Sequence, residues 1–236
     1  MSIQSVRLVL FVTLLSFTTN SCIVKDPVTG KKTVTLVSEA QEQQTGDSYN
    51  PQVLAEFGVY DDAKMQAFIE REGKAMGRIS HRPQINYQFK IVDSPVVNAF
   101  AVPGGYVYFT RGIMAHFNNE AEFAGVLGHE IGHITARHSA KQQSKQQLAQ
   151  GLLITGSLMS ETIRQYGQAA SQTLGLLFMK FSRDNESQSD ELGVEYSTAV
   201  GYDSHEMANF FQTISRLSSA SGQSVPDFMS THPNPD

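Results

Sequence analysis

A motif in the middle of the chain constrains its fold and chemistry more than any other feature. His129, Glu130 and His133 form an H-E-x-x-H pattern within a stretch of helical spacing. Because side chains four residues apart on a helix leave the same face about one turn apart, both imidazoles can bind one tetrahedral ion. Glu130 then stands beside the ion, where it can act on a water that the ion activates. The motif therefore predicts a zinc hydrolase site on a helix.

The residues around the motif favour this helix. Asn119 and Glu122 have the spacing of a capping box, a pattern that begins helices. Apolar residues then recur at helical spacing: Phe123, Val126, Leu127, Ile131 and Ile134. In this context, chance occurrence is a poor explanation of the motif.

A zinc site of this kind needs a third protein ligand. The metzincin pattern is excluded because it requires Gly at 136 and His at 139, where this chain has Ala136 and Ser139. His138 would lie about 180° round a regular helix from His129, so we expect it at the surface or in a layer behind the ligands. Three further histidines lack suitable companions and are expected to be ordinary: His81, His116 and His205.

An acidic segment further along the chain offers a better third ligand. Ser182 or Asp184 can cap a helix that begins there. On this helix Glu186 and Asp190 share one face, which suits a metal-binding Glu and an Asp that orients a metal-binding imidazole through a hydrogen bond. Taken alone, the segment could equally be an ordinary solvated acidic helix.

Three stretches resemble the HtpX and BepA type of gluzincin metallopeptidases, a family that includes the integral-membrane CaaX prenyl proteases. They are residues 98–112, 128–138 and 182–190, and Thr231-His232-Pro233 adds a fourth match. The resemblance covers most of the chain from about Asp26 onward. The family often has Glu-Ala-Asp where this chain has Gln188-Ser189-Asp190, a departure that keeps the Asp.

The resemblance implies a set of site residues. One zinc ion is expected on His129, His133 and Glu186, with Glu130 as the catalytic base and Asp190 behind a ligating imidazole. His232 is expected near the zinc, either as an extra ligand or as a group that stabilises the oxyanion.

The fold class expected is α+β and mostly helical, a zincin-like domain with a small sheet or hairpin beside the metal helix. Helical patterns begin at Glu39, span residues 61–79 and begin again at Asp203, while Tyr87–Val92 alternates like a strand. Residues 97–101 and 105–110 are expected to form two strands around a turn.

The first of these two strands has a candidate function. Its free edge could hold an extended peptide over the zinc, through residues Asn98, Ala99, Phe100 and Ala101. A purely structural hairpin is the alternative. Between the two zinc helices, residues 145–181 contain short apolar runs, which predict amphipathic helices over the cleft and no second membrane crossing.

The N-terminus resembles an export signal. Arg7 precedes a ten-residue apolar run, Leu8–Phe17, which is too short to span a membrane but fits a signal peptide. Cys22 is the only cysteine and resembles the lipid-attachment site of a bacterial lipoprotein, although a free or buried thiol is the alternative. We expect a signal peptide at 1–21, a lipid-anchored tether at 22–38 and a metallopeptidase domain at 39–236.

These observations define the predicted function. The net charge of −5 and the lack of a basic stripe disfavour a nucleic-acid partner. The chain is expected to be a zinc metalloendopeptidase that cleaves unfolded or damaged envelope proteins. It would be anchored by lipid in a bacterial envelope and face the periplasm, at the outer membrane rather than the inner. A zinc-containing chaperone with little proteolysis and a gluzincin exopeptidase are the alternatives.

Overall fold

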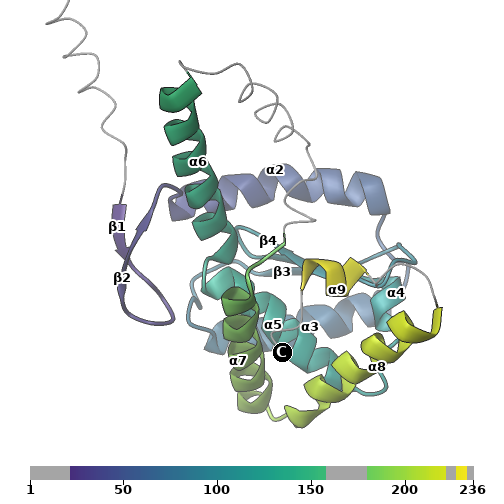
Figure 1. The fold of residues 1–236 in the computed structure, drawn as a ribbon. Coiled ribbons are helices and arrows are strands. Elements are labelled where there is room, and N and C mark those ends of the chain that lie inside the picture. The colour runs from purple at the N-terminus through teal and green to yellow at the C-terminus, as the bar shows by residue number, and fades with distance from the viewer. Residues whose placement is uncertain (1–21, 158–179, 222–226, 233–236) are drawn as a thin grey trace, which may run out of the picture.

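The computed structural model describes residues 22–157, 180–221 and 227–232 (Figure 1). The predicted signal peptide and most of the predicted helices over the cleft lie outside these residues. The strands are β1 (Cys22–Lys25), β2 (Lys32–Thr35), β3 (Gln88–Val92), β4 (Ala99–Val102) and β5 (Tyr106–Thr110). The helices are α2 (Glu39–Phe57), α3 (Ala63–Ile79), α4 (Arg111–Met114), α5 (Glu120–Thr135), α6 (His138–Ser157), α7 (Arg183–Ala199), α8 (His205–Ser221) and α9 (Asp227–Thr231).

A three-stranded sheet lies between helices on both of its faces. Its order is β3-β5-β4, with β5 parallel to β3 and antiparallel to β4. Along β5, Tyr106 and Tyr108 pack in a core with Val53 of α2, whereas Val107 and Phe109 belong to the core shared with α3 and α5. Figure 1 shows α2 on one side of the sheet and α3 and α5 on the other. The predicted α+β class, mostly helical with a small sheet beside the metal helix, is confirmed.

The metal helix α5 begins almost as expected. The side chain of Asn119 accepts a hydrogen bond from the backbone N–H of Glu122. The Glu122 carboxylate, however, accepts from the backbone and side chain of Asn118 and does not return to Asn119, so only half of the capping box forms. Every residue of α5 from Glu122 to Thr135 is buried, which makes the helix the centre of the core.

Small residues bring α7 against α5. A Cβ added to Gly128 of α5 would lie 2.9 Å from the carbonyl oxygen of Gly193 on α7. A Cβ added to Gly193 would lie 3.0 Å from the backbone of both Gly125 and His129. Only glycine allows this close approach, which places the acidic face of α7 opposite the histidines of α5.

The N-terminal segment is more ordered than the predicted tether. β1 and β2 form an antiparallel hairpin in which Cys22 pairs with Thr35, and Asp26 binds the turn between them. Asp26 also pairs with Lys141 on α6 at 2.6 Å, and the Thr35 hydroxyl contacts that of Ser144 at 3.1 Å. Hairpin formation and these polar contacts therefore hold the first part of the predicted 22–38 tether beside α6.

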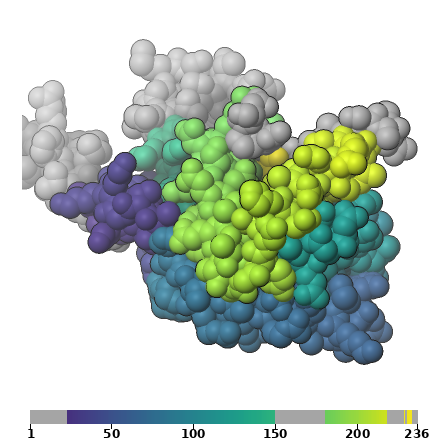
Figure 2. Space-filling model, turned by 90° about the horizontal axis from the view of Figure 1, so that it is seen from below, coloured from purple at the N-terminus to yellow at the C-terminus, as the bar shows by residue number. Residues whose placement is uncertain are grey.

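The remaining helices agree with the sequence patterns. Ser38 completes a capping box at the start of α2, α3 fills the predicted 61–79 segment, and Ser182 caps α7. In Figure 2, α7 and α8 cover much of the face in view, and the hairpin projects at its margin in purple. Among the described residues, no helix has both the length and the apolar character that crossing a bilayer requires.

Candidate metal centre

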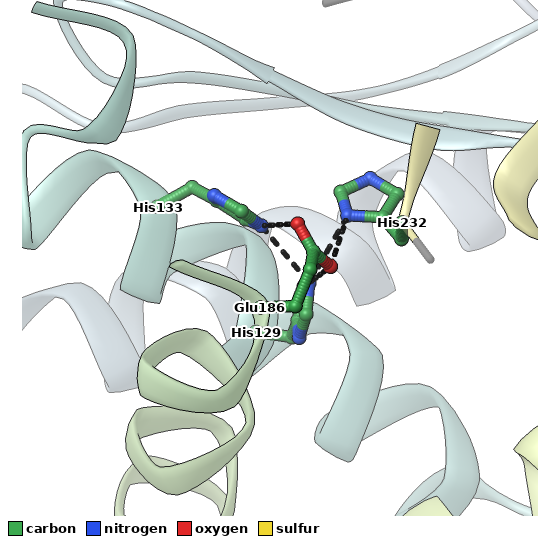
Figure 3. Close-up of side chains that lie close together, drawn as sticks. All are labelled: His129, His133, Glu186 and His232. Carbon is green, nitrogen blue, oxygen red and sulfur yellow. Dashed lines mark hydrogen bonds and ion pairs between the residues drawn. The ribbon is translucent and has the colours of Figure 1, made fainter. Parts of the chain in front are cut away.

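Four side chains from three separate segments meet at one point. His129 and His133 come from α5, Glu186 from the first turn of α7, and His232 from the residue after α9. All four are buried, and their ligand atoms lie within 4.8 Å of one another. Figure 3 shows the four side chains pointing toward a common centre. Within the described residues, no other group of three or more potential metal ligands occurs.

The distances among these atoms fit a tetrahedral zinc ion. Ligands about 2.05 Å from such an ion lie about 3.3 Å from each other. The two histidine Nε2 atoms are 3.0 Å apart, and the Glu186 carboxylate oxygens lie 3.4 Å from His129 Nε2 and 3.6 Å from His133 Nε2. His232 Nδ1 lies 3.2 Å from His129 Nε2 and 3.0 Å from Glu186 Oε2. Three imidazole nitrogens and a carboxylate are also ligands that zinc prefers.

Asp190 orients His129. Its Oδ1 lies 2.8 Å from His129 Nδ1, so that nitrogen donates to the carboxylate and Nε2 faces the cluster. Burial opposes a charge on His129, yet the hydrogen bonds to Asp190 and Glu186 outweigh it and raise its pKa to about 10. Burial likewise opposes ionisation of Glu186, but the two histidines beside it lower its pKa to about 2. The site thus concentrates negative charge where a cation can replace a proton.

Glu130 lies beside the cluster, and its carboxylate makes no hydrogen bond within the described residues. Its side chain is fully buried, and neither carboxylate oxygen has a hydrogen-bond partner among the described residues. Burial raises its pKa, while His232 and His129 and the backbone of Ala101 on β4 act in the opposite direction. A buried carboxylate without hydrogen bonds is costly in a core that serves stability alone, so this group points to chemistry.

His138 is not where a continuous helix would put it. α5 ends at Thr135, Arg137 adopts a left-handed backbone with φ of 57°, and His138 begins α6. The chain thereby turns His138 back, so that its Nδ1 lies 3.0 Å from Nδ1 of His133. It is buried behind the ligands, and the surface alternative is wrong. Burial lowers its pKa to about 4.

Phe181 is a site residue that the sequence did not reveal. Its ring stacks on the His133 imidazole, with centroids 4.2 Å apart and an interplanar angle of 28°. The residue directly precedes the Ser182 cap, so its position depends on where α7 begins. A single aromatic residue before a helix carries no signal that would identify this contact.

The four predicted substrate-binding residues lie at the edge of the sheet. Ala99, Phe100 and Ala101 belong to β4, and Asn98 directly precedes it. Because β5 pairs with one side of β4, the other side is the outer edge of this sheet. Next to it is a shallow pocket, lined by Ala101, Val102, Pro103, Glu42, His133, Ile134, Arg137 and Ser139. Edge and pocket both lie beside the metal ligands.

Comparison with known proteins identifies the family. The model of peptidase family M48 matches residues 63–236. The chain belongs to this family. Membership confirms the predicted family and the predicted class of enzyme, a metallopeptidase. The match includes α5, α7 and α9, and therefore every segment that contributes to the M48 site described above.

Several curated proteins are similar to this M48 chain. The mitochondrial metalloendopeptidase OMA1 of Arabidopsis thaliana is 31% identical over 179 residues, which is 75% of this chain and 35% of that protein. The beta-barrel assembly-enhancing protease of Yersinia pestis is 30% identical over 218 residues, 89% of this chain and 45% of that protein. The Escherichia coli protein of the same name is 29% identical with the same coverage. The chain thus spans less than half the length of these relatives.

Proposed function

We propose that this chain is a zinc metalloendopeptidase, with zinc held by His129, His133 and Glu186. The observation that carries the proposal is the near-tetrahedral group of ligand atoms beside a buried carboxylate, Glu130, whose oxygens accept no hydrogen bond from the described residues. A structural zinc site needs no such carboxylate, whereas hydrolysis needs a base beside the ion. The family match and the names of the similar proteins support the same activity.

The mechanism uses the side chains of this site. When bound, zinc would supply Lewis acidity, which acidifies a water and polarises the scissile carbonyl. Glu130 takes a proton from the attacking water while the water oxygen bonds to the carbonyl carbon of the substrate. As the carbon–nitrogen bond breaks, Glu130 passes that proton to the departing amine. Burial raises the pKa of Glu130, which makes the carboxylate a stronger base for the first of these transfers.

β4 is proposed to align the substrate. An extended peptide can pair with the outer edge of β4, which lies beside Glu130 and the metal ligands. The backbone N–H and carbonyl of Asn98 are already bonded to Thr110. Backbone hydrogen bonds from the stretch Ala99 to Ala101 would then hold a peptide of varied sequence, since they do not involve substrate side chains. This arrangement suits unfolded protein, whose backbone is exposed.

His232 occupies the fourth corner of the site. Of the two roles expected for it, extra ligand and oxyanion stabiliser, the position of Nδ1 among the ligand atoms favours the first. Its Nε2 also lies 3.5 Å from Glu130 Oε1. Because a catalytic zinc site keeps one position for water, His232 would have to withdraw before hydrolysis.

The activity can be tested by digestion of unfolded envelope proteins with the mature chain. Reactions would contain the untreated protein, the protein with a zinc chelator and the protein after zinc is restored, and mass spectrometry would identify the fragments. Internal cuts that disappear and return with zinc are expected. Trimming from a terminus alone would favour the exopeptidase, and binding without cleavage would favour the chaperone.

We also propose a place in the bacterial envelope, with Cys22 as a lipid anchor. Two similar bacterial proteins are named for beta-barrel assembly, which supports a place in the envelope and envelope proteins as substrates. The ordered hairpin begins at Cys22. A lipid on this residue would therefore hold the enzyme domain close to the bilayer. Intact-mass measurement decides the point, because an unmodified Cys22 or cleavage beyond it would disprove the anchor.

A further inference from the structure

A chain of hydrogen bonds runs from α7 to the back of His133. Gln188 Oε1 lies 2.9 Å from His138 Nε2, and His138 Nδ1 lies 3.0 Å from His133 Nδ1. The Ser189 hydroxyl is also 3.3 Å from His138 Nδ1. His138 and His133 are both buried, so water does not readily replace these contacts. The chain meets His133 on the nitrogen that faces away from the ligand cluster.

The proton positions along this chain are coupled. If His133 Nε2 binds a metal, its lone pair must be free and the ring proton must be on Nδ1. Within the part of the chain that the structure describes, that proton is donated to His138 Nδ1, which must then be an acceptor. The proton of His138 is consequently on Nε2, where the Gln188 amide oxygen accepts it. If His138 Nδ1 instead donated to His133 Nδ1, the proton of His133 would be on Nε2, where it would face the cluster.

We propose that His138 is a positioning residue for His133, and that Gln188 selects the tautomer of His138 that this role requires. The proposal rests on the zinc site proposed above. α7 would then contribute to the site three times: it supplies the ligand Glu186, orients His129 through Asp190, and orients His133 through Gln188 and His138. Both ligating histidines of α5 would thus be aligned by residues of α7, His129 directly and His133 through His138.

Variants at His138 can separate orientation from packing. His138→Leu fills the space but removes the acceptor, and we expect it to weaken zinc binding by roughly 10–100-fold, as loss of an orienting contact does. In His138→Asn the amide oxygen can take the place of Nδ1, so most of the affinity should return. His205→Leu changes an exposed histidine of α8 and should have no effect. Affinities would be measured by competition with a chromogenic chelator.

The tautomer gives a readout independent of affinity and activity. ¹⁵N NMR of the imidazoles in the zinc-loaded parent protein should show His138 protonated on Nε2 and unprotonated on Nδ1. Gln188→Leu should weaken this preference while the helix remains folded, since Gln188 is only partly buried. Should His138→Leu fail to fold, the parent spectrum and Gln188→Leu still test the proposal.

Each outcome has a distinct meaning. A proton on His138 Nδ1, unchanged zinc affinity in His138→Leu, or an Asn variant no better than the Leu variant would overturn the positioning role and leave the zinc peptidase intact. If the parent protein does not bind zinc, the proposed function itself fails.

Discussion

The two helices that provide the proposed zinc ligands differ in almost every respect. α5 is buried from Glu122 to Thr135 and carries the helix-spaced apolar residues of the core. α7 has a buried face that includes Glu186, Ser189, Leu192 and Gly193, while Glu191, Val194 and Glu195 are exposed. α5 therefore holds two ligands and the proposed base rigidly in the core. α7 is a surface helix, and only the row of residues on its buried face contacts the ligand cluster and its surroundings.

This difference separates two kinds of residue in the site. On α5, the reacting groups are held by packing of the whole helix. On α7, Asp190 bonds to His129 of α5 and Gln188 bonds to His138 at the start of α6, so the site depends on individual hydrogen bonds and on the close approach at Gly193. A volume-preserving substitution of the proposed base on α5 should therefore lower turnover. Substitutions in the row on α7 should instead lower the affinity for zinc.

The largest expected effect on catalysis comes from α5. Glu130→Gln keeps the shape of the side chain but removes the base, so turnover should fall by roughly 10²–10⁴-fold. Zinc content and the melting temperature should stay near those of the parent, because Glu130 is not a proposed ligand. Peptidase assays beside metal analysis test this prediction. Parent-like turnover would remove Glu130 from the mechanism.

Among the variants proposed here, the largest effect on metal binding is expected from a change on α7. Glu186→Ala deletes a ligand and should weaken zinc binding by more than the roughly 10–100-fold cost of losing an orienting contact. Glu195→Ala, at an exposed position on the same helix, is the matched control. The readout is zinc affinity by chelator competition. If Glu186→Ala binds zinc like the parent, Glu186 is not the third ligand, and His232, the other residue of the cluster, is the next to examine.

A smaller effect is expected at Asp190. Asp190→Asn retains an oxygen that can accept from His129 Nδ1 but loses the negative charge, so zinc affinity or activity should fall by about 10–100-fold at most. Glu191→Gln removes a neighbouring exposed charge and should leave both unchanged. A loss as large as that of Glu186→Ala would mean that Asp190 itself binds the metal.

The smallest expected effect is on the contact between the helices. Gly193→Ala places a methyl group 3.0 Å from the backbone of α5 and should destabilise the fold by about 1–3 kcal/mol, the usual cost of overpacking. Val194→Ala, at a 43% exposed position, is the control and should be nearly neutral. Thermal unfolding measures both. Equal stability of the two variants would show that α7 can shift away from α5 and that the site does not depend on the close approach at Gly193.

Local patterns in the sequence were enough to predict the helices and strands of the site. The period of apolar residues placed α5, and the polar caps placed the start of α7. Alternation placed β3, and the turn residues between them placed β4 and β5. Glu186 and Asp190 were assigned correctly to one helical face because side-chain spacing along a helix is a local property. The hairpin at β1 and β2 was missed, since its short strands depend on contacts with α6.

The sequence by itself determined the motif, its helix and the chemical class that the family resemblance implied. Only the tertiary structure decided that His232 lies at the fourth corner, that Phe181 stacks on His133, and that His138 lies behind it. The physical reason is that these contacts join residues on different elements, and each depends on where an element ends. At Arg137 a single residue with a left-handed backbone ends α5 and redirects His138, a change that helical periodicity does not register.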